Sequence, residues 1–137
     1  MEVKHSFNTI TVKVDANCIS ATDAATLNKQ RAIYGICIPV GLVDDNTYGY
    51  PKSGTVALEG FLMAIEGKSG AETEYVGTLL ISGKVVDVPT GTIIAVGTST
   101  LVVGTDGKVA SGESAKAGKW TIQKASTSGS LFVDIVG

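Results

Sequence analysis

The sequence predicts a mainly β protein, a single-domain antiparallel β-sandwich or β-barrel of about eight to ten short strands with at most one short helix. Short runs rich in Val, Ile, Leu and Thr recur along the chain and are separated by turn-forming Gly, Pro, Asp and Ser residues. The clearest series runs from Thr78 to Val109, where no apolar run reaches the length of a helix. Its runs are cut at Ser82-Gly83, at Pro89 to Gly91, at Gly97 to Ser99 and at Asp106-Gly107.

The N-terminal part combines a polar lead, a strand and a possible helix. Residues 1–6 are polar, which predicts a flexible N-terminal arm; an arm that becomes ordered on a partner is the alternative. Residues 7–14 alternate apolar and polar side chains, which predicts a half-buried strand. A short helix is predicted at 22–31 with Thr22 or Asp23 as its N-cap, and a loop is the alternative because so short and polar a helix needs tertiary packing.

The next segment is predicted to be a strand followed by a long loop. Residues 33–40 have strand character, and Pro39 should end this strand or place it at a sheet edge, since proline cannot donate a ladder hydrogen bond. The loop at 41–54 is rich in turn residues and carries Tyr48 and Tyr50. Loops of this length are often functional, and exposed tyrosines are good contact residues. The alternative is that both rings fold back over the sheet.

The remaining elements are strands with one further loop. Residues 55–65 form another predicted strand, and residues 110–119 are small and polar, which predicts a surface loop. The segments 120–125 and 131–136 are predicted to pair as a closing hairpin that turns near Ser128-Gly129. In the last strand one face is expected to carry Leu131, Val133 and Ile135.

Length and composition place residues 7–137 in one domain. The chain is 44% hydrophobic and only 18% charged, which favours either a β-rich monomer or further burial by self-association or docking on a larger assembly. With a net charge of −2 and no Lys/Arg cluster, we expect no nucleic-acid partner. We also expect no membrane span and no signal peptide, hence synthesis in a cytoplasm, with Cys18 and Cys37 as reduced thiols.

Few residues suit catalysis. The single histidine, His5, lies in the N-terminal lead, so the folded body offers no histidine base for a serine or cysteine nucleophile. Glu59 could converge with Glu66 or Asp87 as a pair of carboxylates for sugar hydrolysis, but such pairs arise by chance in most domains. We therefore expect a non-enzymatic protein without a cofactor or a metal ion.

Two further patterns match ligand sites only in part. Gly67-Lys68-Ser69 lacks the earlier glycine of a phosphate-binding loop, because Leu62 occupies that position. Asp44-Asp45-Asn46 offers oxygen ligands for calcium but lacks the spaced carboxylates of a known calcium loop. We interpret it as a solvated turn.

A series of β segments occurs in a characteristic order in the second part of the chain. The segments are Ile33 to Val40, Val56 to Ile65 with its Val-Ala-Leu-Glu-Gly start, Gly91 to Gly97, Leu101 to Val109 with its Asp-Gly-Lys-Val turn, Trp120 to Ala125, and Gly129 to Gly137. This order resembles the small β-rich capsid decoration, or cement, proteins of tailed bacteriophages. The resemblance covers about residues 33–137, whereas residues 1–32 have no counterpart and 34–54 carries a longer, tyrosine-bearing insertion.

The resemblance implies a non-catalytic structural protein of the virion that binds the major capsid protein on the outer surface of the capsid. It further implies a homotrimer that stabilises the expanded head. Many weak contacts repeated over a symmetric shell give high avidity, so a small apolar patch on each subunit suffices. Our hypothesis for the partner-binding residues is Val3, Phe7, Ile10, Tyr48 and Tyr50.

Two other classes of function remain open at this point. One is a carbohydrate-binding or adhesin-like β module, which would need Trp120, Tyr48 and Tyr50 to form an exposed aromatic platform. The alternation of Trp120 with Ile122 instead favours a place in the core. The other class is a self-assembling shell or tail-tube subunit, which would form large particles without a partner.

Overall fold

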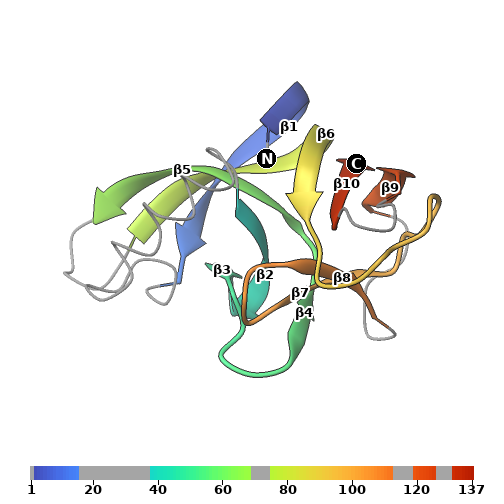
Figure 1. The fold of residues 1–137 in the computed structure, drawn as a ribbon. Helices are drawn as coiled ribbons and strands as arrows, with labels where there is room; N and C mark the ends of the chain where they lie inside the picture. The colour runs from blue at the N-terminus through green and yellow to red at the C-terminus, as the bar shows by residue number, and fades with distance from the viewer. Residues whose placement is uncertain (1, 16–37, 69–74, 113–118, 126–130) are drawn as a thin grey trace.

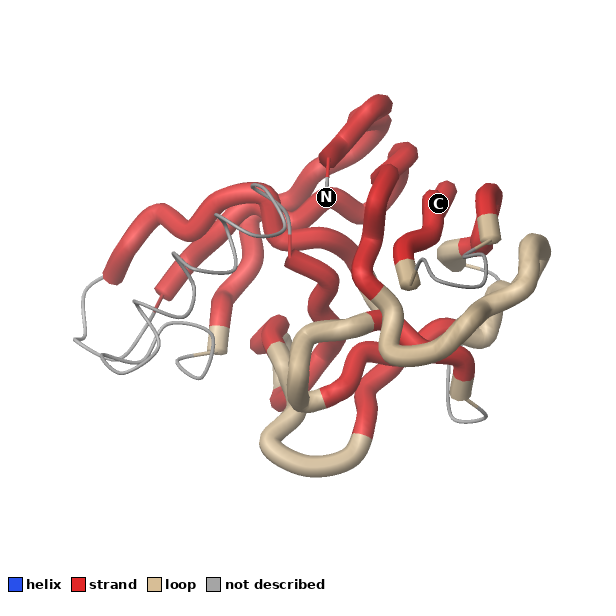
Figure 2. Tube along the Cα trace, viewed as in Figure 1, coloured by secondary structure: helices blue, strands red, loops and turns tan. Residues whose placement is uncertain are grey.

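The computed structural model of the chain describes residues 2–15, 38–68, 75–112, 119–125 and 131–137 (Figure 1). Within these ranges it contains ten β-strands and no helix, which confirms the predicted mainly β fold (Figure 2). The strands are β1 (Glu2–Val14), β2 (Ile38–Asp44), β3 (Thr47–Gly49), β4 (Thr55–Ala57), β5 (Gly60–Lys68), β6 (Tyr75–Pro89), β7 (Leu101–Gly104), β8 (Val109–Ser111), β9 (Thr121–Lys124) and β10 (Phe132–Val136). The helix predicted at 22–31, both cysteines and the predicted turn near Ser128-Gly129 lie outside the described residues.

A closed barrel forms the larger part of the fold. The strand order is β1-β3-β2-β5-β6-β10-β9, and β1 also pairs with β6, so the first five of these strands close on themselves. The strand pairs are antiparallel except β1–β3, where Lys13 and Val14 pair in parallel with Thr47 and Tyr48. β4, β7 and β8 form a separate three-stranded sheet, which lies below the barrel in Figure 1, while β10 and β9 stand beside β6.

The first strand begins earlier than the sequence predicted. Glu2 pairs with Val86 and Val3 with Val85 of β6, and the ladder continues to the end of β1. Val3 also packs against the hydrophobic core. The structure therefore differs from the predicted flexible arm: residues 2–6 belong to a strand, because β6 is long enough to supply hydrogen bonds along the whole of β1.

The longest strand runs through a predicted turn. β6 passes Ser82-Gly83 without interruption, since Gly83 takes a φ of 151° and exchanges backbone hydrogen bonds of 2.9 and 2.8 Å with Gly137. The segment 91–97 differs from its prediction in the opposite sense, because the sequence predicted a strand and the structure has a loop. The backbone there makes single hydrogen bonds instead of a ladder, from Gly97 N–H to the Ile122 carbonyl and from Thr98 N–H to the Ala95 carbonyl.

The predicted loop at 41–54 contains a hairpin. β2 and β3 are joined by Asp45-Asn46, an exposed turn in which Asn46 has a φ of 55°. Pro39 pairs with Phe61 of β5, whereas the pairing of β2 with β3 begins only at Gly41. The proline thus occupies a position that is paired on one side only, where its missing N–H costs no ladder hydrogen bond. The prediction that Pro39 ends the strand or places it at a sheet edge was wrong, because β2 continues to Asp44 and lies between β3 and β5.

The predicted strand at 55–65 is divided between the two sheets. Leu58 and Glu59 separate β4 from β5, and their N–H groups donate to the carbonyls of Leu101 and Val40 at 3.0 Å. Because one of these carbonyls belongs to each sheet, the short break links the barrel to the second sheet.

Two hydrophobic clusters form the core. The larger one joins the second sheet to β6, β9 and β10 and includes Trp120, which is 1% exposed. The indole Nε1–H of Trp120 donates to the Glu59 carbonyl at 3.1 Å, and the ring packs edge-on against Phe61 with centroids 5.0 Å apart. This confirms the predicted core position of the tryptophan. The smaller cluster lies within the barrel and consists of Val12, Val14, Ile38, Val40, Leu62 and Leu79.

Candidate functional site

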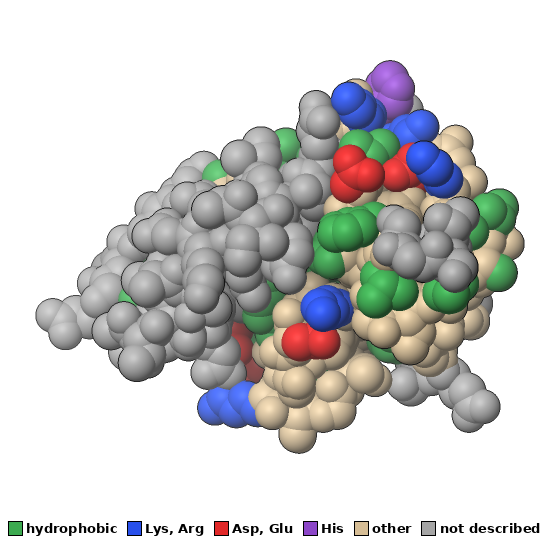
Figure 3. Space-filling view, in the orientation of Figure 1, with side chains coloured by type: hydrophobic (Ala, Val, Ile, Leu, Met, Phe, Trp, Pro, Cys, Tyr) green, Lys and Arg blue, Asp and Glu red, His purple; other side chains and the backbone are tan. Residues whose placement is uncertain are grey.

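Four exposed hydrophobic side chains are carried by the loop after β6 and by the segment that enters β10, and the hydrogen bond from Thr90 N–H to the Leu131 carbonyl joins these two segments. We call these side chains the loop patch: Ile93 is 60% exposed, Val96 62%, Leu131 43% and Phe132 47%. In Figure 3, hydrophobic side chains gather on the face formed by this loop, β9 and β10. Exposed apolar side chains that are grouped in this way are typical of protein-contact surfaces.

The loop that carries Ile93 and Val96 is fixed at both ends. The Thr90 N–H donates to the Leu131 carbonyl at 2.8 Å, and the Thr90 hydroxyl lies 3.0 Å from the same oxygen. At the other end Gly97 N–H donates to the Ile122 carbonyl at 2.9 Å, while Ile94 in between is buried in the core. Ile93 and Val96 are β-branched and stiff, so this loop presents them at a small entropic cost of binding.

Charges of both signs border the patch. Asp134 on β10 pairs in register with Lys124 on β9, and its carboxylate accepts a hydrogen bond from the Asp87 N–H of β6 at 3.2 Å. Figure 3 shows Lys and Asp or Glu side chains interspersed above the hydrophobic ones. A border of mixed sign suits a protein surface with mixed charges better than a polyanion.

The five residues that the sequence suggested for partner binding lie away from the loop patch in the fold, on β1, β3 and the segment after it. Ile10 is 39% exposed, whereas Val3, Tyr48 and Tyr50 are half-buried and pack against the core clusters. The side chain of Phe7 lies outside the described residues. Both tyrosine rings thus fold back over the sheet, and Ile10 is the most accessible of the four described side chains.

The aromatic platform that a carbohydrate-binding module would need is not formed by Trp120, Tyr48 and Tyr50. Trp120 is buried, and both tyrosines are half-buried. The carboxylates considered for sugar hydrolysis lie in different surroundings. Glu59 is 7% exposed and forms an ion pair with Lys119 at 3.2 Å, while Asp87 is on the surface. Glu66 has no described side chain.

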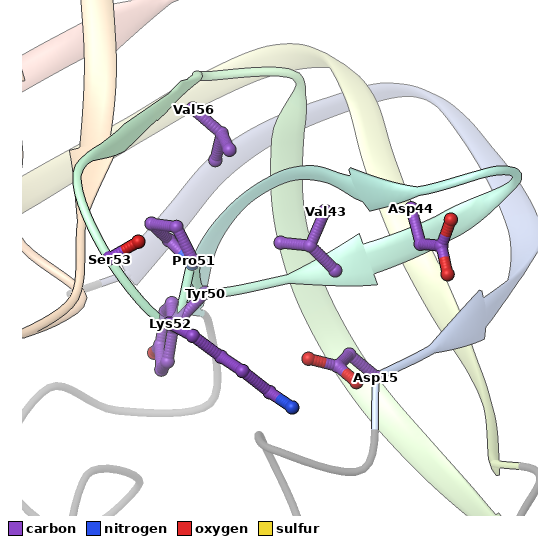
Figure 4. A pocket seen from close by; sticks show the side chains of 8 residues that line it. All are labelled: Asp15, Val43, Asp44, Tyr50, Pro51, Lys52, Ser53 and Val56. Carbon is purple, nitrogen blue, oxygen red and sulfur yellow. The ribbon is translucent and has the colours of Figure 1, made fainter.

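A groove lies at the end of the barrel where β1, β2 and the segment after β3 meet (Figure 4). It has a volume of about 410 Å³, within the range of ligand-binding clefts. Asp15 and Asp44 contribute carboxylates and Lys52 an ammonium group, and Val43, Tyr50, Pro51, Ser53 and Val56 form the rest of the lining. The sequence drew attention to the loop that carries Asp44 and Lys52, but only the β1–β3 pairing brings Asp15 to the same place.

Comparison with protein-family models, with curated proteins and with solved structures gives no match. In the part of the chain that the structure describes, no helix is both long and apolar enough to cross a membrane.

Proposed function

We propose that this protein is a non-enzymatic structural protein of a tailed bacteriophage that binds the outer surface of the capsid and stabilises the expanded head. The main observation behind this proposal is the loop patch, in which Ile93 and Val96 are presented by a loop that hydrogen bonds and the buried Ile94 hold in place, and Leu131 and Phe132 by the start of β10. The resemblance to decoration proteins supports the same proposal, and most of its segments lie on strands of one compact β fold.

The small size of the patch suits a partner that offers the same binding site many times. Four partly exposed side chains cannot supply the area of a stable pairwise interface, which typically buries on the order of 800 Å² on each partner. On a symmetric shell, however, the same small contact is repeated, and a homotrimer engaging three sites at once gains avidity without new contacts. A capsid surface is therefore a better match for this patch than a monomeric protein.

The variant Ile93→Ser/Val96→Ser should weaken binding to expanded heads of the source phage at least about tenfold, because each substitution removes apolar contact area. Co-sedimentation with purified heads measures the binding, and far-UV circular dichroism checks the fold. Leu42→Ser is the matched control, since Leu42 is 38% exposed on β2, outside the patch. Normal binding by the double variant together with a loss in Ile10→Ser would move the contact to the N-terminal surface.

The solution mass tests the proposed oligomer. We expect light scattering behind a sizing column to give a mass near three times 14.0 kDa that persists on dilution. A monomer at all concentrations would contradict a preformed trimer and would require trimers to assemble on the shell. Large particles formed without heads would instead identify a self-assembling shell or tube subunit.

A further inference from the structure

We propose that the groove between Asp15, Asp44 and Lys52 binds a lysine or arginine side chain of an extended segment of a partner protein. The groove is separate from the loop patch and is built from different strands, so this inference stands independently of the capsid proposal. Three features of the groove support it: its net negative charge, the apolar residues among its lining, and its exposed rim.

The charge of the groove selects a cation. Asp15 follows β1, and its N–H donates to the Tyr48 carbonyl at 2.9 Å, which fixes the backbone that carries the carboxylate. Asp44 ends β2, and its carboxylate accepts a hydrogen bond from the Asp45 N–H at 2.8 Å. These two carboxylates against the single ammonium of Lys52 leave one net negative charge in the groove. Ionised carboxylates only accept hydrogen bonds, so they favour an ammonium or guanidinium donor.

The walls suit the aliphatic stem of such a side chain. Val43 and Val56 are half-buried and Pro51 is buried, and all three line the groove. Tyr50 also lines it and packs against both core clusters, so its ring is held in place. Lysine and arginine bury their methylene stems against apolar surface while the charged head reaches polar groups, and a tyrosine ring can add a cation–π contact.

The openness of the groove favours a protein segment over an enclosed small molecule. Asp44, Lys52 and Ser53 are exposed, and Figure 4 shows the Lys52 side chain extending toward Asp15. Small ligands are usually buried over most of their surface, which this groove does not offer. A side chain whose backbone remains outside needs no such enclosure.

Titration of the ¹⁵N-labelled protein with the peptide acetyl-Gly-Arg-Gly-amide tests the proposal by NMR. We expect saturable shifts at residues of the groove, and much smaller shifts with acetyl-Gly-Gln-Gly-amide. Asp15→Asn and Asp44→Asn should each weaken binding about fivefold, the effect expected when one ion pair at about 4 Å in water is lost. Asp45→Asn is the matched control, because Asp45 is an exposed carboxylate on the same hairpin that does not line the groove.

Lys52→Ala provides a variant that should act in the opposite direction. Removal of the positive charge of Lys52, which repels that of the arginine, is expected to tighten binding of the arginine peptide about twofold to fivefold.

Equal binding by the wild type, Asp15→Asn and Asp44→Asn, or equal binding of the glutamine peptide, would overturn the proposal. Tighter binding of 1,5-diaminopentane than of the peptide would overturn the assignment to a protein side chain. The double variant in the loop patch should leave these shifts unchanged, which separates this test from the capsid proposal.

Discussion

Trp120→Ala is expected to lower the free energy of unfolding by about 3–5 kcal/mol, the largest effect of any single substitution considered for this chain. Trp120 is 1% exposed in the larger core cluster, and its ring packs edge-on against Phe61 with an interplanar angle of 74°. Truncation leaves a cavity and also leaves the Glu59 carbonyl without its indole donor. Urea denaturation followed by far-UV circular dichroism measures the loss, because the variant has no tryptophan to report by fluorescence.

Trp120→Phe separates packing from hydrogen bonding at the same site. Phenylalanine keeps an aromatic ring against Phe61 but cannot donate to the Glu59 carbonyl, so we expect a smaller loss of about 1–3 kcal/mol. A Trp120→Ala variant as stable as the wild type would show that the ring does not belong to the core. It would also reopen the carbohydrate-binding alternative, which needs this ring at the surface.

Gly83→Ala should be the second most damaging substitution, with a loss of about 3 kcal/mol. A Cβ at this position would collide with the backbone carbonyl of His5 on β1, and the φ of 151° is one that residues other than glycine rarely adopt. Gly83 also exchanges hydrogen bonds with Gly137, so the backbone cannot move away without breaking that pair. Thermal unfolding measured by calorimetry gives the change.

Gly91→Ala is the matched control for this substitution. Gly91 is exposed, has no positive φ, and its added Cβ would meet no atom within 4 Å. Alanine there restricts the unfolded chain without straining the fold, so stability should stay the same or rise by less than about 1 kcal/mol. Equal losses in both glycine variants would contradict a specific role for the close approach of β1 to β6.

The local pattern of the sequence was sufficient to predict many of the strands. Val12 and Val14 are buried on alternate positions of β1, as the period of two requires. Trp120 and Ile122 are both buried, as their alternation predicted. The turn at Asp45-Asn46 was also evident, because Asp and Asn tolerate the left-handed backbone that such turns use.

The candidate contact surface was much less predictable. Leu131 was expected to share the inner face with Val133 and Ile135, yet it is 43% exposed. Ile93 and Ile94 are chemically identical neighbours, and one is exposed while the other is buried. No periodicity distinguishes them, because they lie in a loop whose course is set by hydrogen bonds to Leu131 and Ile122.

Local alternation and turn chemistry were enough to predict the fold class, most of the strands, the core position of Trp120 and several of the turns. Three features became evident only from the folded chain: residues 2–6 pair with β6, β6 continues through Gly83, and Asp15 and Asp44 line one groove. Each of these depends on a partner distant in the chain. Strand pairing and barrel closure are non-local, and the sequence near a residue does not specify which backbone will lie beside it.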